Sequence, residues 1–201
     1  EDWDEDIIKK WNKDIIKDFN KIKEFTLLES FVKYDCVDFI KLLYKKCELS
    51  NSDLKNVLDI AFYNNSINCL IWFNNIGILE NIYINYYDIF YHCCENNHFE
   101  VANWIYQNKL KKIEYRMSVI HTMVKRGYIK MLKFVYNINQ KDNRKNILMS
   151  NYAIFRVVYK HNKLDIFKWL LTLIETDEIS KIIFTFNKIK NLKKMQIFYK
   201  Y

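Results

Sequence analysis

The densest group of metal-ligating side chains in the sequence lies near its middle and consists of His92, Cys93, Cys94 and His98. Imidazole nitrogens and thiolate sulfurs are the ligands that zinc and copper prefer. Adjacent cysteines on a helix point in different directions, however, and a free cysteine packs in a core like a small apolar residue. We therefore interpret the two cysteines as packing residues and predict no metal site and no cofactor.

Catalytic chemistry has less support in the sequence. Gly77 and Gly127 are the only glycines, and neither has the neighbours of a phosphate-binding loop, which excludes a nucleotide cradle of that kind. Cys36 is a candidate nucleophile, but no spacing in the sequence brings a histidine base beside it. We predict that the chain is not an enzyme.

A repeat organises most of the chain. Five ten-residue segments align without gaps, and we take the fourth residue of each segment as its anchor. The anchors are Val37, Ile67, Phe99, Ile129 and Leu164, and they are 30, 32, 30 and 35 residues apart. A period of this length is typical of stacked helix-turn-helix units.

The residues around the anchors predict a turn followed by a helix. The residue two positions before each anchor is of a type that tolerates the left-handed backbone conformation in which helices end: Asp35, Asn65, Asn97, Gly127 and Asn162. From the anchor onward, apolar residues recur at offsets 0, +2, +3, +5 and +6, which is helical spacing. Offset +5 holds Leu42, Trp72, Trp104, Phe134 and Trp169, which we interpret as core and not as a platform for stacking bases.

A second set of apolar positions precedes each turn and predicts a short first helix. Offsets −9, −6 and −5 are mainly apolar in all five units, and Cys93 and Cys94 occupy two of these positions. A sixth, weaker unit is anchored on Leu192. Residues 1–24 stand outside the repeat and read as one or two helices that cap the first unit, with a recruitment motif as the alternative.

The segment Asn97-His98-Phe99-Glu100-Val101-Ala102-Asn103-Trp104-Ile105 resembles the Gly-His-Leu-Glu-Val-Val-Lys-Leu-Leu segment of ankyrin repeats. The resemblance covers residues 28–175 and is greatest to the degenerate repeats encoded by giant DNA viruses. The Thr-Pro-Leu-His start and the Gly-Ala-Asp finger turn of that family are absent from every unit, so we expect plain loops or extra helical turns between repeats in place of β-hairpins. A tetratricopeptide pattern fits poorly because its Gly, Ala and Pro positions are unfilled.

The predicted fold is therefore all-α, a solenoid of stacked ankyrin-like repeats with an N-terminal helical cap. The cap covers residues 1–24, and five to six repeats fill 25–201, at approximately 25–54, 55–84, 85–116, 117–150, 151–179 and 180–201. The resemblance implies a non-catalytic scaffold that binds another protein on a concave surface.

Offsets −8, −4 and −3 face that concave surface in ankyrin-like stacks, so their residues are the candidate partner-binding set. From these positions we select Tyr91, His121, Lys125, Arg126, Arg156, Lys160 and His161. Residues 1–100 carry a net charge of −7, whereas residues 101–201 carry +15. This asymmetry predicts an acidic protein segment as the partner, with RNA or DNA as the alternative.

The composition predicts a soluble intracellular protein. Five cysteines without framework spacing indicate a reducing compartment, and no signal peptide or membrane span is recognisable. We expect the cytoplasm, and host cytoplasm or the virion if the viral resemblance holds.

Overall fold

Helices form in the described residues wherever the repeat places apolar residues at helical spacing, and these residues contain no strand. The computed structural model describes residues 25–45, 49–114, 116–140 and 153–173. The chain divides into two compact units, Glu1–Leu110 and Lys111–Tyr201, and each is described by itself. The predicted cap at 1–24 and the sixth repeat at 180–201 lie outside the described residues.

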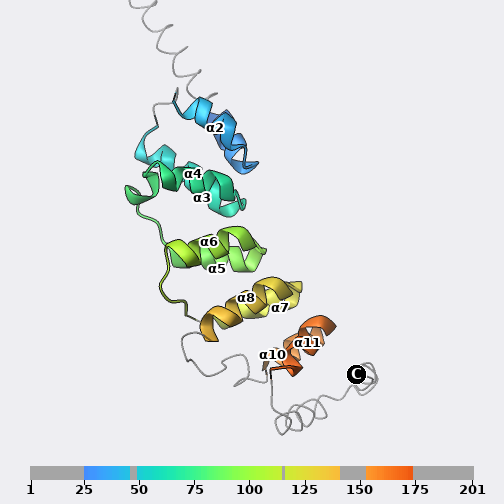
Figure 1. The fold of residues 1–201 in the computed structure, drawn as a ribbon. Coiled ribbons are helices and arrows are strands. Elements are labelled where there is room, and N and C mark those ends of the chain that lie inside the picture. The colour runs from blue at the N-terminus through green and yellow to red at the C-terminus, as the bar shows by residue number, and fades with distance from the viewer. Residues whose placement is uncertain (1–24, 46–48, 115, 141–152, 174–201) are drawn as a thin grey trace, which may run out of the picture. The chain divides into compact units, whose positions relative to one another are not determined.

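The first unit is built from helical hairpins (Figure 1). Residues 25–33 are helical and precede α2 (Val37–Tyr44). They are followed by α3 (Asn51–Tyr63), α4 (Ile67–Asn75), the 3₁₀ turn η1 (Ile78–Glu80), α5 (Tyr86–Asn96) and α6 (Phe99–Asn108). In this unit α3 packs against α4 and α5 against α6, while α3 also packs on α5, and α4 on both α2 and α6.

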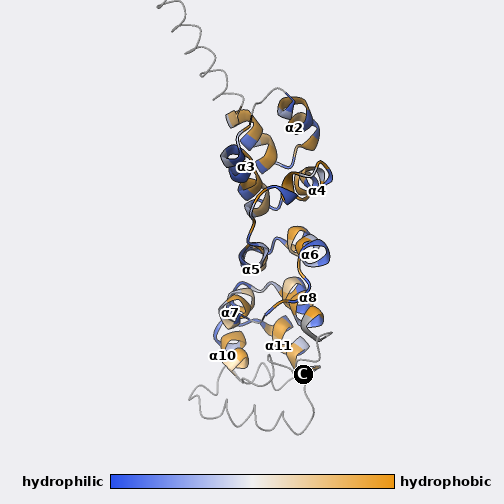
Figure 2. Cartoon of the chain, turned by 90° about the vertical axis from the view of Figure 1, so that its left-hand side faces the viewer, coloured by the Kyte–Doolittle hydropathy of each residue, from blue (hydrophilic) through white to orange (hydrophobic). Residues whose placement is uncertain are grey.

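The second unit repeats this arrangement. It contains α7 (Met117–Arg126), α8 (Ile129–Gln140), α10 (Ala153–Lys160) and α11 (Leu164–Leu171). Within the unit α7 packs against α8, α10 against α11, and α7 against α10. Figure 2 shows that α7 and α10 lie side by side, with α8 and α11 on the other side of the same unit.

The predicted turns are confirmed at all five positions. Asp35, Asn65, Asn97, Gly127 and Asn162 have φ between 53° and 84°, which is the left-handed region. The next residue then donates its backbone N–H to the carbonyl five positions earlier, at 2.8–3.0 Å in every unit. This is the bond that closes a helix end in the Schellman motif. Each anchor is the first residue of its second helix: α2, α4, α6, α8 and α11.

In the first unit, the turn residue of one hairpin also caps the second helix of the next. The Asp35 carboxylate accepts hydrogen bonds from the backbone N–H groups of Asn68 and Cys69 in α4, at 3.2 and 2.9 Å. The Asn65 side-chain oxygen accepts from Val101 N–H in α6 at 3.3 Å. Neither α4 nor α6 has a side-chain cap from its own N-cap residue. The helix-terminal N–H groups are therefore satisfied by the preceding hairpin.

The core follows the predicted apolar positions except at offsets 0 and +5, and all five anchors at offset 0 are only half-buried. Offset −9 is buried in all five units, at Leu28, Leu58, Phe90, Ile120 and Phe155, and offset +1 is exposed in all five. Offset +5 was expected in the core, but its aromatic residues are only half-buried and Leu42 is 66% exposed. Burial is concentrated at +2, +3 and +6, although Phe39 at +2 is exposed, because only the face of the second helix that points at its own hairpin and its neighbours is covered.

The connection between α4 and α5 is η1 and not a β-hairpin. Gly77 precedes η1 with a φ of 78°, and Ile78 and Leu79 inside it are buried. A short apolar turn thus replaces the finger expected of an ankyrin repeat. None of the described helices has the length and apolar character that crossing a lipid bilayer requires.

Candidate partner-binding surface

Six of the seven predicted partner-binding residues lie together in the second unit. His121, Lys125 and Arg126 are on α7, whereas Arg156 and Lys160 are on α10 and His161 follows it directly. Residues four apart share one face of a helix, so each helix carries its residues on one side. Because α7 packs against α10, the structure brings the two sets together as one surface, which we call the basic surface.

Electrostatic coupling confirms that charges converge at its centre. Partial desolvation, together with the cations Lys125, Lys160 and Lys163, lowers the pKa of His161. An effect of this kind requires the three ammonium groups to stand close to the ring. His161 therefore lies among the cations of the basic surface, and both desolvation and these cations disfavour its charged form.

Lys163 belongs to this surface, although the sequence did not single it out. A Cβ atom added to Gly127 would lie 3.1 Å from the Lys163 Nζ, so this lysine reaches over the turn that ends α7. Lys163 sits directly before an anchor, at an offset where the other described units have Cys36, Ser66, His98 and Tyr128. Because these four residue types have little in common, a cation at this offset could not be expected from the repeat.

The exposure of the basic surface suits binding. Lys125, Arg126, Arg156 and Lys160 are exposed, and His121 and His161 are half-buried. The described residues of the second unit include eleven lysines and arginines but only two acidic residues, Glu114 and Asp165. This surface therefore stands in a strongly positive field.

Tyr91 is not exposed, so the prediction that it lies on an accessible surface is wrong. It belongs to the first unit and is only 6% exposed, with its ring at 5.8 Å from that of Phe90 in an edge-to-face contact. Offset −8 is polar or charged in the other four units, which made Tyr91 look exposed. A large apolar ring at a half-covered position gains by folding onto its neighbours instead.

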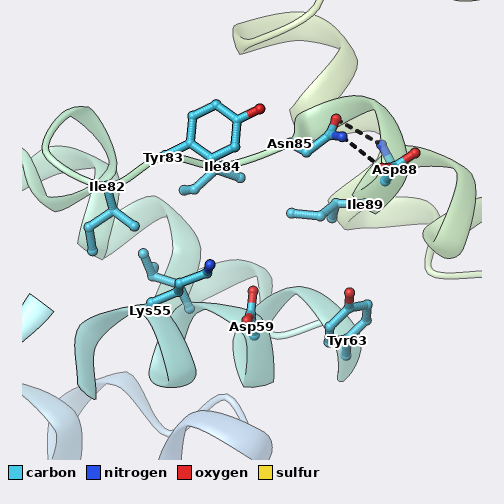
Figure 3. Close-up of a pocket in the computed structure, with 10 residues that line it drawn as sticks. Lys55, Asp59, Tyr63, Ile82, Tyr83, Ile84, Asn85, Asp88 and Ile89 are labelled. Atoms are coloured by element: carbon cyan, nitrogen blue, oxygen red, sulfur yellow. Dashed lines mark hydrogen bonds between the residues drawn. The ribbon is translucent and has the colours of Figure 1, made fainter. Parts of the chain in front are cut away.

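The first unit contains a pocket of about 270 Å³ between α3 and the segment that leads into α5 (Figure 3). Lys55, Asp59 and Tyr63 approach it from α3, while Tyr83 and Asn85 lie on the opposite side. Burial in this pocket raises the pKa of Asp59, and the nearby Lys55 opposes the shift.

The polar groups at the far end of the pocket have a structural role. Asn85 caps α5, accepting from Asp88 N–H at 3.3 Å and donating to the Asp88 carboxylate at 2.7 Å. These groups are already paired with each other, so they do not converge on a ligand. We therefore place the candidate functional site on the basic surface and not in the pocket.

The histidine and cysteine cluster is partly assembled. One ligand atom each from His92, Cys93 and His98 lie within 4.8 Å of one another, whereas Cys94 is not part of this group. The expectation that adjacent cysteines point apart agrees with this arrangement. The convergence of both histidines on one of the cysteines was not visible in the sequence.

No protein-family model, no curated protein and no solved structure matches the chain. The resemblance to ankyrin repeats thus rests on the repeat in the sequence and on the helical, repeat-like architecture of the described residues.

Proposed function

We propose that the protein is a non-catalytic, ankyrin-like interaction scaffold whose basic surface binds an acidic segment of another protein. The observation that carries this proposal is the packing of α7 against α10, which brings their exposed cations onto one surface, with Lys163 reaching over the turn that ends α7. Such a concentration of like charge is costly for folding and is relieved when an anionic partner binds. The ankyrin-like assignment is supported by the period near 32 residues and by the five identical helix-ending turns.

The spacing of the cations suits an extended acidic segment. Residues four apart on a helix are about 6 Å apart along its axis. Alternate side chains of an extended chain are about 6.8 Å apart, which is a close match. An acidic peptide lying along α10 can therefore place two of its carboxylates near Arg156 and Lys160, which are four residues apart.

Nucleic acid is the weaker alternative. Proteins that bind single strands stack bases on exposed aromatic rings. The large hydrophobic side chains that are exposed in the described residues all lie in the first unit, between Leu27 and Tyr87. The basic surface thus offers charge without a stacking platform, which favours carboxylates over bases.

The four described cysteines carry free thiols, in keeping with the intracellular setting we propose.

The test is charge reversal with a matched control. Lys125, Arg126, Arg156 and Lys160 are changed together to Glu, and binding of a fluorescent oligo-glutamate peptide is measured by anisotropy at low salt. Exposed pairs contribute roughly 0.2–1 kcal/mol each, so we expect affinity to fall about tenfold or more. Single-stranded and duplex oligonucleotides are measured in parallel.

The control reverses four exposed lysines outside the basic surface: Lys111, Lys112, Lys130 and Lys168. This control variant changes the net charge by the same amount as the test variant. A comparison of the two therefore separates the effect of local contacts from the effect of the overall electrostatic field. Equal losses in both variants would refute a specific surface. Binding of oligonucleotides that exceeds peptide binding, and that depends on the same four residues, would replace the acidic protein with nucleic acid.

A further inference from the structure

A second candidate site lies in the first unit, on the hairpin formed by α5 and α6. His92 and Cys93 are near the end of α5, and His98 directly precedes α6. The turn at Asn97, with its φ of 61°, reverses the chain between them. This reversal brings one ligand atom of each residue within 4.8 Å of the others.

His98 is held in the state that a metal ligand needs. Its ring donates a hydrogen bond to the backbone carbonyl of Phe62, and its Nδ1 is buried with no hydrogen-bond partner among the described residues. Donation from one ring nitrogen to a carbonyl is the usual arrangement that fixes the tautomer of a metal-binding histidine. The lone pair on Nδ1 is then available.

His92 is oriented by its neighbours in a similar way. Its ring packs edge-on against Tyr63 with centroids 4.3 Å apart, and it lies 6.0 Å from the ring of His98. The Nδ1 of His92 is also buried without a hydrogen-bond partner among the described residues. Asn96 contacts the other ring nitrogen, Nε2, at 3.1 Å.

Both histidines that converge on Cys93 have a buried ring nitrogen without a hydrogen-bond partner among the described residues, and this requires an explanation. Leaving a buried polar atom without a partner costs about 1–3 kcal/mol, so native structures rarely do so twice in one place. Cys93 is completely buried, and its thiol makes a long contact from Sγ to the Phe62 carbonyl, at 3.9 Å. All three groups would be satisfied by one cation.

We propose that His92, Cys93 and His98 bind a zinc ion, with water as the fourth ligand. Two imidazole nitrogens and a thiolate form a ligand set typical of zinc, and three protein ligands leave one position open. Both histidines are half-buried and not sealed in the core, which gives the ion and the water access. Ligand atoms on one zinc ion are about 3.5 Å apart, so side-chain movements of roughly 1 Å complete the site.

Zinc at this position would fasten α5 to α6 across the Asn97 turn. The Cys93 thiol must lose its proton to bind, forming the S–Zn bond while one proton passes to the buffer. Binding is therefore accompanied by proton release and strengthens as pH rises.

Titration calorimetry of the full chain with ZnCl₂ tests the site, using Cys93→Ala and its neighbour Cys94→Ala as a matched pair. Both cysteines are fully buried, so the two variants lose similar packing, and circular dichroism checks that each still folds. We expect one zinc per chain for the wild type and Cys94→Ala. Affinity should fall about a hundredfold or more in Cys93→Ala. Equal affinities in the two variants would overturn the proposal.

Cobalt gives a second measurement that does not depend on affinity alone. Co²⁺ bound to a thiolate shows a sulfur-to-metal charge-transfer band in the near ultraviolet. We expect this band in the wild type and in Cys94→Ala, and its loss in Cys93→Ala. The variant His98→Gln should weaken binding but keep the band at saturating cobalt. A band that persists without Cys93, or that is absent from the wild type, contradicts the site.

Discussion

At the scale of single residues, His161 reports on the basic surface. Its pKa is lowered by partial desolvation and by Lys125, Lys160 and Lys163, and each of these cations disfavours the charged imidazolium. The ring is therefore a native probe of the local potential. It also lies where an acidic partner would dock.

Removing two of these cations is expected to raise the pKa of His161 toward its ordinary value. The change is Lys125→Met with Lys160→Met, and the measurement is an NMR titration of the His161 ring proton. Lys130→Met, on the exposed side of α8, is the control and should leave the titration unchanged. Oligo-glutamate peptide should raise the wild-type pKa in the same direction, because bound carboxylates stabilise the imidazolium. A pKa that falls or stays constant in the double variant would show that the lysines do not act on this ring.

At the scale of elements, the turn residues have two roles. Asn65 adopts the left-handed conformation that ends α3, and its side chain accepts a hydrogen bond from Val101 in α6. It also donates to Glu100 at 3.1 Å. The same residue thus shapes one hairpin and caps a helix of the next.

Two substitutions of Asn65 separate these roles. Asn65→Gly keeps the turn but removes the cap, which should cost about 1 kcal/mol of unfolding free energy. Asn65→Ala removes the cap and also strains the turn, so roughly 1–2 kcal/mol more should be lost. Urea unfolding measures both, and hydrogen exchange at the Val101 amide should quicken in each variant. Asn64→Ala, at the adjacent exposed asparagine, is the control. Equal stability of the two Asn65 variants would show that the turn conformation contributes little.

The helices and turns were predictable from the sequence because they depend on local rules. The residue two positions before each anchor has to tolerate a positive φ. The spacing of the apolar residues then places the start of each second helix at its anchor. Tyr91 and the offset +5 aromatics were misplaced because periodicity identifies a face, whereas the depth of burial depends on what packs against it. The place of Lys163 on the basic surface and the convergence of His92 and His98 on Cys93 could not be predicted, since these contacts arise from the path of the chain around a turn.

At the scale of the whole molecule, the two compact units differ in the sign of their net charge. Residues 1–110 carry a net charge of −6 and residues 111–201 carry +14. The boundary between the two compact units thus separates an acidic part of the sequence from a strongly basic one. A field of this size acts chiefly on the rate at which partners meet.

Salt should therefore slow association more than it speeds dissociation. For oligo-glutamate peptide and the intact chain, stopped-flow fluorescence should show the association rate falling roughly tenfold between about 20 and 200 mM salt, because the Debye length shortens to below 10 Å. The dissociation rate should change several times less. If dissociation carried most of the salt effect, short-range contacts and not the field of the second unit would govern binding.

The cap that Asp35 and Asn65 supply to the following hairpin also gives the first unit a direction. In each of these bonds the capping side chain precedes the capped helix in the sequence. None of these caps in the first unit therefore requires a segment that is synthesised later than the helix it caps. During synthesis the ribosome releases the chain from its N-terminus, and domains generally fold as they emerge. Each hairpin can therefore act as a template for its successor, and growth of the protein on the ribosome can follow the same order as growth of its hydrogen-bond network.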